Sequence, residues 1–439
     1  MRTALLTALA LVATAIAAPV TAQAGANTLV ASHQPGAVPD GTPTFYADVL
    51  PILQQNCQIC HQEAGANMGG MVAPWPLVSY EDAATRAGRI ANAVKRGYMP
   101  PWSASPIHNG TFDNERVLED EEKATIIAWA EAGAPAGDPA DAPPAPDFLT
   151  ATAATGGWTL GEPDLILSFD EPYCLTDDIN DIYVDIPVRI TEDMLPEDRW
   201  ISSVEYRNGP AVHHIVGGVG GLVPGREPRA EEEGYGRVLE AGPRTINFNM
   251  HFNKPAGPGT GLCTDIQAGI RFKPDGEVIR FVTGGDNLRI RGFKIPAGAS
   301  SYSASMEYTF EEDVELRSFM PHMHLRGKAA LYEITYPDGQ HEILLHVPDY
   351  DFNWQHTYFF KDRPIIPAGS VLRLTLWWDN SENNPANPDP TVDVVWGGPT
   401  YMEMSQGYMN FRKLQEVRYV VGDPIPATLR TRGEDNEAN

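Results

Sequence analysis

The chain has 439 residues, a length that favours two or three domains of roughly 150 residues each. Hydrophobic residues make up 42% of it and aromatic residues 9%, which excludes disorder over most of the chain, and the 38 prolines and 40 glycines predict many turns and few long helices. With 58 acidic and 32 basic residues the formal net charge is −26, so we expect no nucleic-acid partner, because phosphates would be repelled.

The N-terminus has the layout of a secretory signal peptide. Met1 and Arg2 precede an apolar run over residues 4–18, and small residues follow at 21–24. Because the run is shorter than the ~20 residues of a membrane span and Pro19 closes it, cleavage near Ala24 is preferred to a retained anchor. We therefore expect a signal peptide over residues 1–24, a periplasmic or secreted protein, and no membrane span.

Three segments after the N-terminus have the apolar spacing of helices. They are residues 46–55, 81–96 and 120–132. The acidic run over residues 119–122 also suits a helix N-terminus. The spacing predicts a small, all-helical first domain over residues 40–133.

This first domain contains the C-x-x-C-H motif Cys57-Gln58-Ile59-Cys60-His61. The two thiols can form thioethers with the vinyl groups of haem, and His61 can coordinate the iron from the same short segment. A local disulfide beside an unrelated histidine is one alternative. A thioredoxin-like redox pair is another, but the strand expected before such a pair is absent. The motif therefore predicts a covalently bound c-type haem in a cytochrome c-like domain.

Three methionines and one histidine are candidates for the sixth ligand of the haem iron. Met99 is preferred, because the prolines at positions 100 and 101 would stiffen its loop and hold the sulfur in place. Met68 and Met71 lie in a glycine-rich loop closer to the cysteines, where packing around the haem edge is the alternative role. His108 is a weaker candidate, with an exposed loop histidine as its alternative.

The composition changes twice beyond residue 133. Residues 134–163 are rich in Ala, Pro, Gly, Asp and Thr and are predicted to form a linker. Short alternating runs with Pro-Asp-Gly and Pro-Ala-Gly turns then predict antiparallel strands. We divide this region into two jelly-roll-like β-sandwiches over residues 164–293 and 294–430, followed by a disordered tail over 431–439. The predicted fold class is thus a small all-α cytochrome c-like domain followed by two antiparallel β-sandwiches.

Five of the 11 histidines form polar clusters in the β region. His322 and His324 are two residues apart, so in a strand their side chains would point to the same face and could bind one ion. His213 and His214 are adjacent and could converge only if the strand ended or bulged there. His251 lies on a third strand-like segment. Neutral imidazole suits copper and zinc, and an oxidising compartment favours copper, although a core or surface role is the alternative for each pair alone.

At these residues the chain resembles the copper type II, ascorbate-dependent monooxygenases, which include the peptidylglycine α-hydroxylating and dopamine β-monooxygenases. The resemblance covers roughly residues 164–425, and its motifs follow the family's order. The motifs are Val212-His213-His214, Met250-His251-Phe252, Pro321-His322-Met323-His324-Leu325-Arg326-Gly327-Lys328 and Tyr401-Met402-Glu403-Met404.

The resemblance implies one copper ion in each sandwich. The electron-transferring copper would be bound by His213, His214 and His251. The catalytic copper would be bound by His322, His324 and Met404. This softer His-His-Met set favours Cu(I), the state that must meet O2. Met404 is preferred to Met402 and Met409 only by its match to the family motif.

The resemblance also implies a disulfide and a substrate-site tyrosine. Cys174 and Cys263 lie where the family has a disulfide, with two separate buried thiols as the alternative. Tyr408 follows the ligand methionine by four residues, as a substrate-site tyrosine does in the family. It would belong to the catalytic site, with a structural phenol as the alternative.

Two positions depart from the family pattern. Peptide-amidating members carry an Arg that holds the peptide carboxylate two residues before the first His of the second-domain pair, and this chain has Met320 there. Peptide amidation is therefore not expected. Ser405 replaces the Cys that follows the ligand methionine in animal members, so one family disulfide is missing. His341, His346 and His356 match no motif and are interpreted as surface or structural residues.

The sequence as a whole predicts an exported copper monooxygenase that hydroxylates a C–H bond of a small molecule or peptide with O2. Electrons from an external donor, such as a periplasmic redox protein or an ascorbate-like reductant, would enter through the haem. One alternative is a non-enzymatic haem and copper protein that transfers electrons or handles copper. Another is an extracellular binding module with structural metals, which an open position at the His-His-Met site would contradict.

Overall fold

The computed structural model describes residues 41–62, 73, 75–146, 157–223 and 228–429. The predicted signal peptide with its cleavage site at Ala24, the methionines Met68 and Met71, and the predicted C-terminal tail lie outside these ranges. No helix within them is long and apolar enough to cross a membrane.

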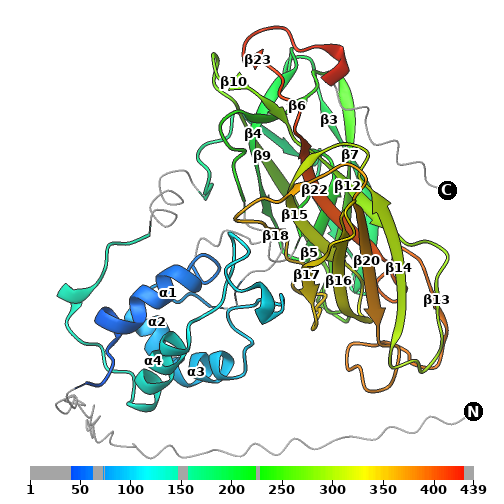
Figure 1. Ribbon diagram of the computed structural model, residues 1–439. Coiled ribbons are helices and arrows are strands. Elements are labelled where there is room, and N and C mark those ends of the chain that lie inside the picture. Colours follow the sequence, from blue (N-terminus) through cyan, green and yellow to red (C-terminus); the bar gives the residue numbers. More distant parts are fainter. Residues whose placement is uncertain (1–40, 63–72, 74, 147–156, 224–227, 430–439) are drawn as a thin grey trace, which may run out of the picture. The chain divides into compact units, whose positions relative to one another are not determined.

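The predicted fold class is wrong, because the described part of the chain contains no sizeable all-α domain. Strands dominate it, and its four α-helices are short (Figure 1). The helices are α1 (Leu50–Asn56), α2 (Tyr80–Ala84), α3 (Ala87–Lys95) and α4 (Asp120–Glu131), with a π-helical turn at Phe45–Val49 and 3-10 turns at Pro106–His108, Pro139–Asp141 and Ala427–Leu429. Proline explains much of the difference, because it removes a helical N–H and clashes with the preceding turn. Pro76, Pro100, Pro101 and Pro106 all lie in the segments between α1 and α4.

The short helices are held by caps and by one shared hydrophobic cluster. At α2 the Ser79 hydroxyl accepts a hydrogen bond from the Asp82 N–H, and the Asp82 carboxylate accepts one from the Ser79 N–H. Glu119 and Glu122 form the same reciprocal cap at α4. Trp129 of α4 is fully buried in the cluster. Packing and caps therefore stabilise helices that would be too short to form alone.

The first part of the β region consists of two facing sheets and a short ribbon. Its strands are β1 (Leu165–Ser168), β2 (Tyr173–Leu175), β3 (Asp181–Ile190), β4 (Arg199–Asn208), β5 (Val212–Gly217), β6 (Tyr235–Leu239), β7 (Arg244–Asn253), β8 (Leu262–Thr264), β9 (Ile266–Phe272), β10 (Val278–Ile279) and β11 (Phe281–Val282). The sheet orders are β1-β9-β4-β6-β11 and β3-β7-β5, with β2 paired to β8. All these pairings are antiparallel except β11 with β6. Phe248 of β7 and Ile270 of β9 are fully buried in a core that both sheets share.

The second part of the β region repeats this arrangement. Its strands are β12 (Gly284–Arg289), β13 (Lys294–Ile295), β14 (Tyr302–Thr309), β15 (Val314–His322), β16 (Gly327–Thr335), β17 (His341–Val347), β18 (Tyr358–Phe359), β19 (Ile365–Ile366), β20 (Val371–Trp378), β21 (Val394–Val395), β22 (Gln406–Lys413) and β23 (Tyr419–Val420). One sheet has the order β12-β22-β15-β18, with β19 also on β15, and the other is β14-β20-β16-β17. Short ribbons pair β13 with β21 and β10 with β23. The domain boundaries drawn from the sequence stay predictions.

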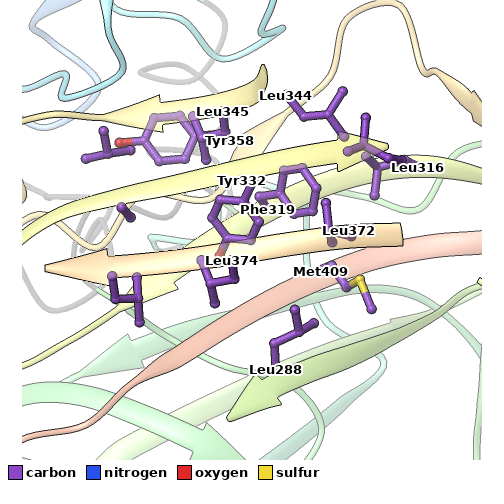
Figure 2. Close-up of a cluster of buried hydrophobic side chains, with 14 of the residues drawn as sticks. Leu288, Leu316, Phe319, Tyr332, Leu344, Leu345, Tyr358, Leu372, Leu374 and Met409 are labelled. Carbon is purple, nitrogen blue, oxygen red and sulfur yellow. The ribbon is translucent and has the colours of Figure 1, made fainter. Parts of the chain in front are cut away.

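The core between the sheets of this second part is aromatic and aliphatic. Figure 2 shows Phe319, Tyr332 and Leu374 among the clustered side chains. All three are fully buried, and the rings of Phe319 and Tyr332 stack with centroids 4.2 Å apart. Phe319 lies on β15, the strand that ends at His322. This core therefore supports the strand that carries one of the predicted metal ligands.

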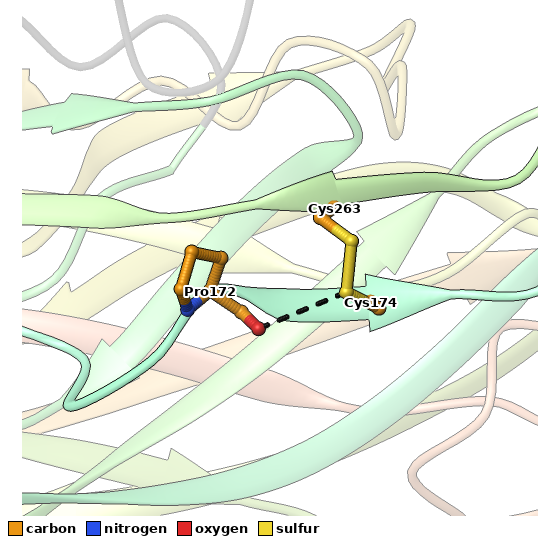
Figure 3. Close-up of a disulfide and its surroundings, with 3 residues drawn as sticks. All are labelled: Pro172, Cys174 and Cys263. Atoms are coloured by element: carbon orange, nitrogen blue, oxygen red, sulfur yellow. Dashed lines mark hydrogen bonds between the residues drawn. A yellow bond between two sulfur atoms is a disulfide. The ribbon is translucent and has the colours of Figure 1, made fainter.

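The predicted disulfide between Cys174 and Cys263 is present. It joins β2 to β8, where the two cysteines lie directly opposite each other (Figure 3). The bridge closes a separation of 89 residues that includes all three histidines of the first predicted copper set. A cross-link of this kind stabilises mainly by restricting the unfolded chain.

Leu374→Ala should destabilise the second part of the β region. Removing this fully buried side chain leaves a cavity in the core, which should cost about 2–5 kcal/mol of unfolding free energy. The matched control is Ile365→Ala, at a position that is 49% exposed, and it should cost less than about 1 kcal/mol. Thermal unfolding followed by circular dichroism measures both. Equal shifts in the two variants would contradict this assignment of the core.

Candidate metal centre

Three of the predicted ligands meet where β5 pairs with β7. His214 lies opposite His251 in this ladder, and the register shifts between Val212 and His214. In a regular strand His213 and His214 would point to opposite faces, so the bulge at His213 is what lets both imidazoles reach the same side. The structure thus brings His213, His214 and His251 together.

The three imidazoles face one another through their Nδ1 atoms. Nδ1 of His214 is 3.3 Å from Nδ1 of His213 and 3.3 Å from Nδ1 of His251. Their ligand atoms all lie within 4.8 Å of one another. Burial lowers the pKa of His213 to about 3 and that of His214 well below its ordinary value, so both rings are neutral at pH 7. Neutral, convergent imidazoles fit a bound metal ion.

Two residues of β3 orient His251. The Asp181 carboxylate accepts a hydrogen bond from His251 Nε2 at 3.0 Å, which leaves Nδ1 unprotonated and directed at the other two rings. The ring of Tyr183 stacks on His251 with centroids 4.1 Å apart and an interplanar angle of 7°. Asp181 also accepts a hydrogen bond from the Thr400 hydroxyl at 2.8 Å. It therefore connects the first histidine set to the chain segment that leads to Met404.

His322 and His324 lie where β15 ends. Both side chains are buried, and their ring centroids are 5.3 Å apart. Nδ1 of His322 is 2.6 Å from Gln355 Oε1, and Nδ1 of His324 is 3.4 Å from the Met402 carbonyl oxygen. Both acceptors hold the proton on Nδ1 and leave Nε2 available to a metal. His324 Nε2 is a buried atom without a hydrogen-bond partner in the described residues, which fits a metal ligand.

Burial keeps this second pair of imidazoles neutral. It lowers the pKa of His322 to about 4 and the pKa of His324 well below its ordinary value. A neutral Nε2 carries the lone pair that a metal requires. The electrostatic state of this pair is therefore the same as that of His213 and His214.

Met404 lies close in the fold to the strand that carries His322. The Gln406 carboxamide donates a hydrogen bond to Met404 Sδ at 3.1 Å, and Gln406 pairs directly with His322 in the ladder between β15 and β22. Tyr408 is partly buried and pairs with Met320 in the same ladder. The predicted catalytic tyrosine and the position that departs from the peptide-amidating pattern are therefore neighbours.

Glu403 is a site residue that the sequence analysis did not single out. It is fully buried and accepts hydrogen bonds from the backbone N–H of His324 at 2.8 Å and of Arg326 at 2.7 Å, and from Trp378 Nε1 at 3.1 Å. Burial raises its pKa to about 7, against these donors and the Arg326 charge. The Glu403 carboxylate thus fixes the turn after His322, and the residue that follows Glu403 in the chain is Met404. The one sequence signal that could have identified Glu403 was its position beside Met404 in the motif.

The two histidine sets adjoin one another. The ring centroids of His214 and His322 are 5.9 Å apart. Phe352 stacks on His213 at 4.7 Å and 10°, and its ring centroid lies 5.8 Å from that of His324. The two sets therefore share one aromatic environment, in which four of the five histidines are buried and His213 is partly buried.

The C-x-x-C-H residues form the turn that follows α1. The His61 N–H donates to the Cys57 carbonyl at 3.0 Å. Nδ1 of His61 donates to the Trp75 carbonyl at 2.9 Å, which leaves Nε2 for a metal. The pKa of the Cys57 thiol is raised to about 12, mainly by burial and secondly by the charge of the nearby Cys60. A reactive redox pair instead needs a thiolate. These residues could hold a haem through two thioethers and one imidazole nitrogen.

Met99 and His108 lie between α3 and α4. Met99 is partly buried. His108 is buried rather than exposed, and its Nε2 accepts a hydrogen bond from the backbone N–H of His346 in β17 at 2.9 Å. This bond and the burial of His108 do not fit the exposed loop histidine that was the alternative to haem ligation, and its weaker candidacy as a haem ligand stays a prediction. Met99 stays the predicted sixth ligand.

The other histidines without motifs differ in their surroundings. His341 is exposed and lies 3.4 Å from a Glu333 oxygen. His356 is buried, with its ring parallel to Trp354 and 5.6 Å from the ring of Trp102.

Comparisons with known proteins identify no family. No family model and no curated protein matches the chain. The major capsid protein P2 of bacteriophage PM2 is 9% identical, with a TM-score of 0.23 over 56% of this chain and 96% of that one. The VP2 subviral particle of infectious bursal disease virus is 10% identical, with a TM-score of 0.18 over 57% of this chain and 72% of that one. A Paenibacillus xanthan lyase is 11% identical, with a TM-score of 0.16 over 55% of this chain and 25% of that one. Such distant likenesses carry no argument about function.

The chain should bind two copper ions, and His251→Ala should bind one. The substitution removes one of three converging imidazoles from the first set and leaves the second set complete. Copper content after dialysis, measured by atomic emission, tests this. His341→Ala is the control, because it removes an exposed histidine, and it should still bind two. Two tightly held ions in His251→Ala would contradict the assignment.

Glu403→Gln should destabilise the protein and weaken copper binding at the predicted His322, His324 and Met404 set. Both carboxylate oxygens accept N–H groups, so an amide would place its own N–H against one of these donors at a cost of about 1–3 kcal/mol. Thermal unfolding and copper titration measure the two effects. Glu307→Gln, at an exposed pair with Arg373, is the control and should change neither. Unchanged copper affinity in Glu403→Gln would exclude the positioning role.

Proposed function

We propose that this protein is an exported, copper-dependent monooxygenase that hydroxylates a C–H bond of a small molecule or peptide with O2. The observation that carries the proposal is the meeting of two chemically different buried ligand sets. One set has three Nδ1 atoms directed at one another, and the other has a His-x-His pair whose Nε2 atoms are left available beside a methionine segment. The difference favours different roles for the two metals.

Copper at these sets would supply one-electron steps for reducing O2 and oxidising a C–H bond. The chain's own contribution is to hold the imidazoles neutral and correctly oriented before metal arrives. Asp181 fixes the tautomer of His251, and Gln355 fixes that of His322. Glu403 holds the backbone of His324 in place. Burial of His214, His251, His322 and His324 also excludes bulk water from the reaction.

Cys57, Cys60 and His61 would hold a c-type haem that supplies single electrons. The Trp75 carbonyl orients His61 by accepting its Nδ1–H. An external donor, a periplasmic redox protein or an ascorbate-like reductant, would reduce this haem. The disulfide between Cys174 and Cys263 is compatible with an oxidising compartment and so supports export.

The neighbourhood of Met320 and Tyr408 bears on the substrate. Met320 pairs with Tyr408 two residues before His322, so an apolar side chain stands where a carboxylate-binding Arg would be needed. This favours a substrate without a carboxylate at that position. Tyr408 would contact the substrate through its ring or its hydroxyl.

Oxygen uptake by the copper-loaded holoprotein under chemical reductant tests the proposal. Candidate C–H substrates should stimulate uptake and yield hydroxylated product identified by mass spectrometry. Both effects should fall at least about a hundredfold in His324→Ala and Met404→Ala, because each removes a ligand of the second set. His341→Ala is the matched control and should retain uptake.

The alternative function predicts a different outcome. If copper and haem cycle normally but no substrate stimulates uptake, the protein is an electron-transfer or copper-handling protein. Full activity in Met404→Ala would instead contradict the assignment of the second ligand set.

A further inference from the structure

The loop that follows Met99 is fastened to the second part of the β region. Phe112 forms an antiparallel bridge with Phe360. The Asn114 carboxamide donates to the Thr357 carbonyl at 2.8 Å and accepts from the Phe359 N–H at 3.1 Å. These contacts hold the loop beside the segment 355–360, which leads into and beyond β18.

Within this contact, an aromatic pair, the peptide bond between His356 and Gln355, and a hydrogen bond lead in turn toward His322. The ring of Trp102 lies 5.6 Å from that of His356 and 5.1 Å from that of Tyr358, centroid to centroid. His356 and Gln355 are both buried. Gln355 Oε1 accepts the hydrogen bond from His322 Nδ1 at 2.6 Å. Trp102 itself lies three residues after Met99, the predicted haem ligand.

We propose that Trp102, His356 and Gln355 form the path by which electrons pass from the haem to the metal at His322, His324 and Met404. The inference rests on the proposed function, because it requires haem at the C-x-x-C-H turn and copper at the second set. It adds that electrons enter at the second set directly. They do not have to pass first through His213, His214 and His251.

Each transfer moves one electron. Haem iron is oxidised from Fe(II) to Fe(III), and copper is reduced from Cu(II) to Cu(I). An external one-electron reductant then restores Fe(II). No bond forms or breaks in Trp102 or His356, and no proton has to move, because the rings only shorten the gap that the electron crosses. Burial of His356 and Gln355 keeps their geometry fixed between turnovers.

Flash photoreduction of the oxidised, copper-loaded holoprotein under anaerobic conditions tests the path. A photosensitiser places one electron on the haem, and absorbance follows haem reoxidation while electron paramagnetic resonance follows loss of Cu(II). The wild type should show a rapid phase whose rate is independent of protein concentration. Trp102→Leu should lose this phase, and Trp102→Phe, which keeps a ring, should retain part of it. Tyr98→Leu removes a 65% exposed aromatic side chain from the same loop and should behave as wild type.

The point of entry is tested with ligand variants. His322→Ala should lose the rapid phase, whereas His251→Ala should keep it. A wild-type rate in Trp102→Leu would overturn the path, as would a rapid phase that survives in His322→Ala and vanishes in His251→Ala. A protein that purifies without covalent haem would overturn both this inference and the haem part of the proposed function. Failure of the path alone would leave substrate-stimulated oxygen uptake with a chemical reductant intact.

Discussion

The first histidine set depends on one local constraint, the bulge between β5 and β7. A pleated strand sends adjacent side chains to opposite faces, so without the bulge one of His213 and His214 would be lost from the cluster. Because His251 lies opposite His214 in the same ladder, the Nδ1 atom of His214 meets the Nδ1 atoms of both His213 and His251. The hydrogen bonds to Asp181 extend this arrangement, since that carboxylate binds His251 on one side and Thr400 on the other. The backbone geometry of two strands therefore determines which imidazoles converge in the first set, and Asp181 connects this set to the segment that leads to Met404.

Burial of the imidazoles is the second feature that shapes the site. The imidazoles of both sets are removed from water, and burial lowers the pKa of His213, His214, His322 and His324. Each orienting partner holds one nitrogen and leaves the other available: Asp181 for His251, Gln355 for His322 and the Met402 carbonyl for His324. Burial removes solvation from the remaining nitrogens, and a bound metal ion would replace it. Glu403 adds rigidity, because it accepts two backbone N–H groups of the turn after His322 and the indole N–H of Trp378 on β20, all of which would otherwise be buried without partners.

The fold could be predicted from the sequence only in part. Periodicity located segments of the short helices, but an all-α domain was wrong, because turns and prolines interrupt the segments between them. Ladder pairing between strands far apart in sequence, such as β12 with β22, has no local signal. The disulfide between Cys174 and Cys263 was anticipated from a family resemblance, and the structure contains it. His108 was a weaker candidate for the sixth haem ligand, with an exposed loop histidine as the alternative. Its hydrogen bond to His346 of β17, 238 residues away, has no signal in its own loop.

The sequence by itself determined which residues are chemically suited to bind metal. Spacing paired His322 with His324 as candidates for one ion, and the C-x-x-C-H motif predicted a turn suited to haem attachment, because these properties depend only on local spacing and side-chain chemistry. The tertiary structure decided everything that requires chain segments to meet. It left Nδ1 of His251 available to a metal, because Asp181 holds Nε2. It also brought the ring centroids of His214 and His322 within 5.9 Å and placed the ring of Trp102 beside that of His356. Such contacts depend on how sheets pair and pack between segments 70 or more residues apart, and no local pattern encodes that distance.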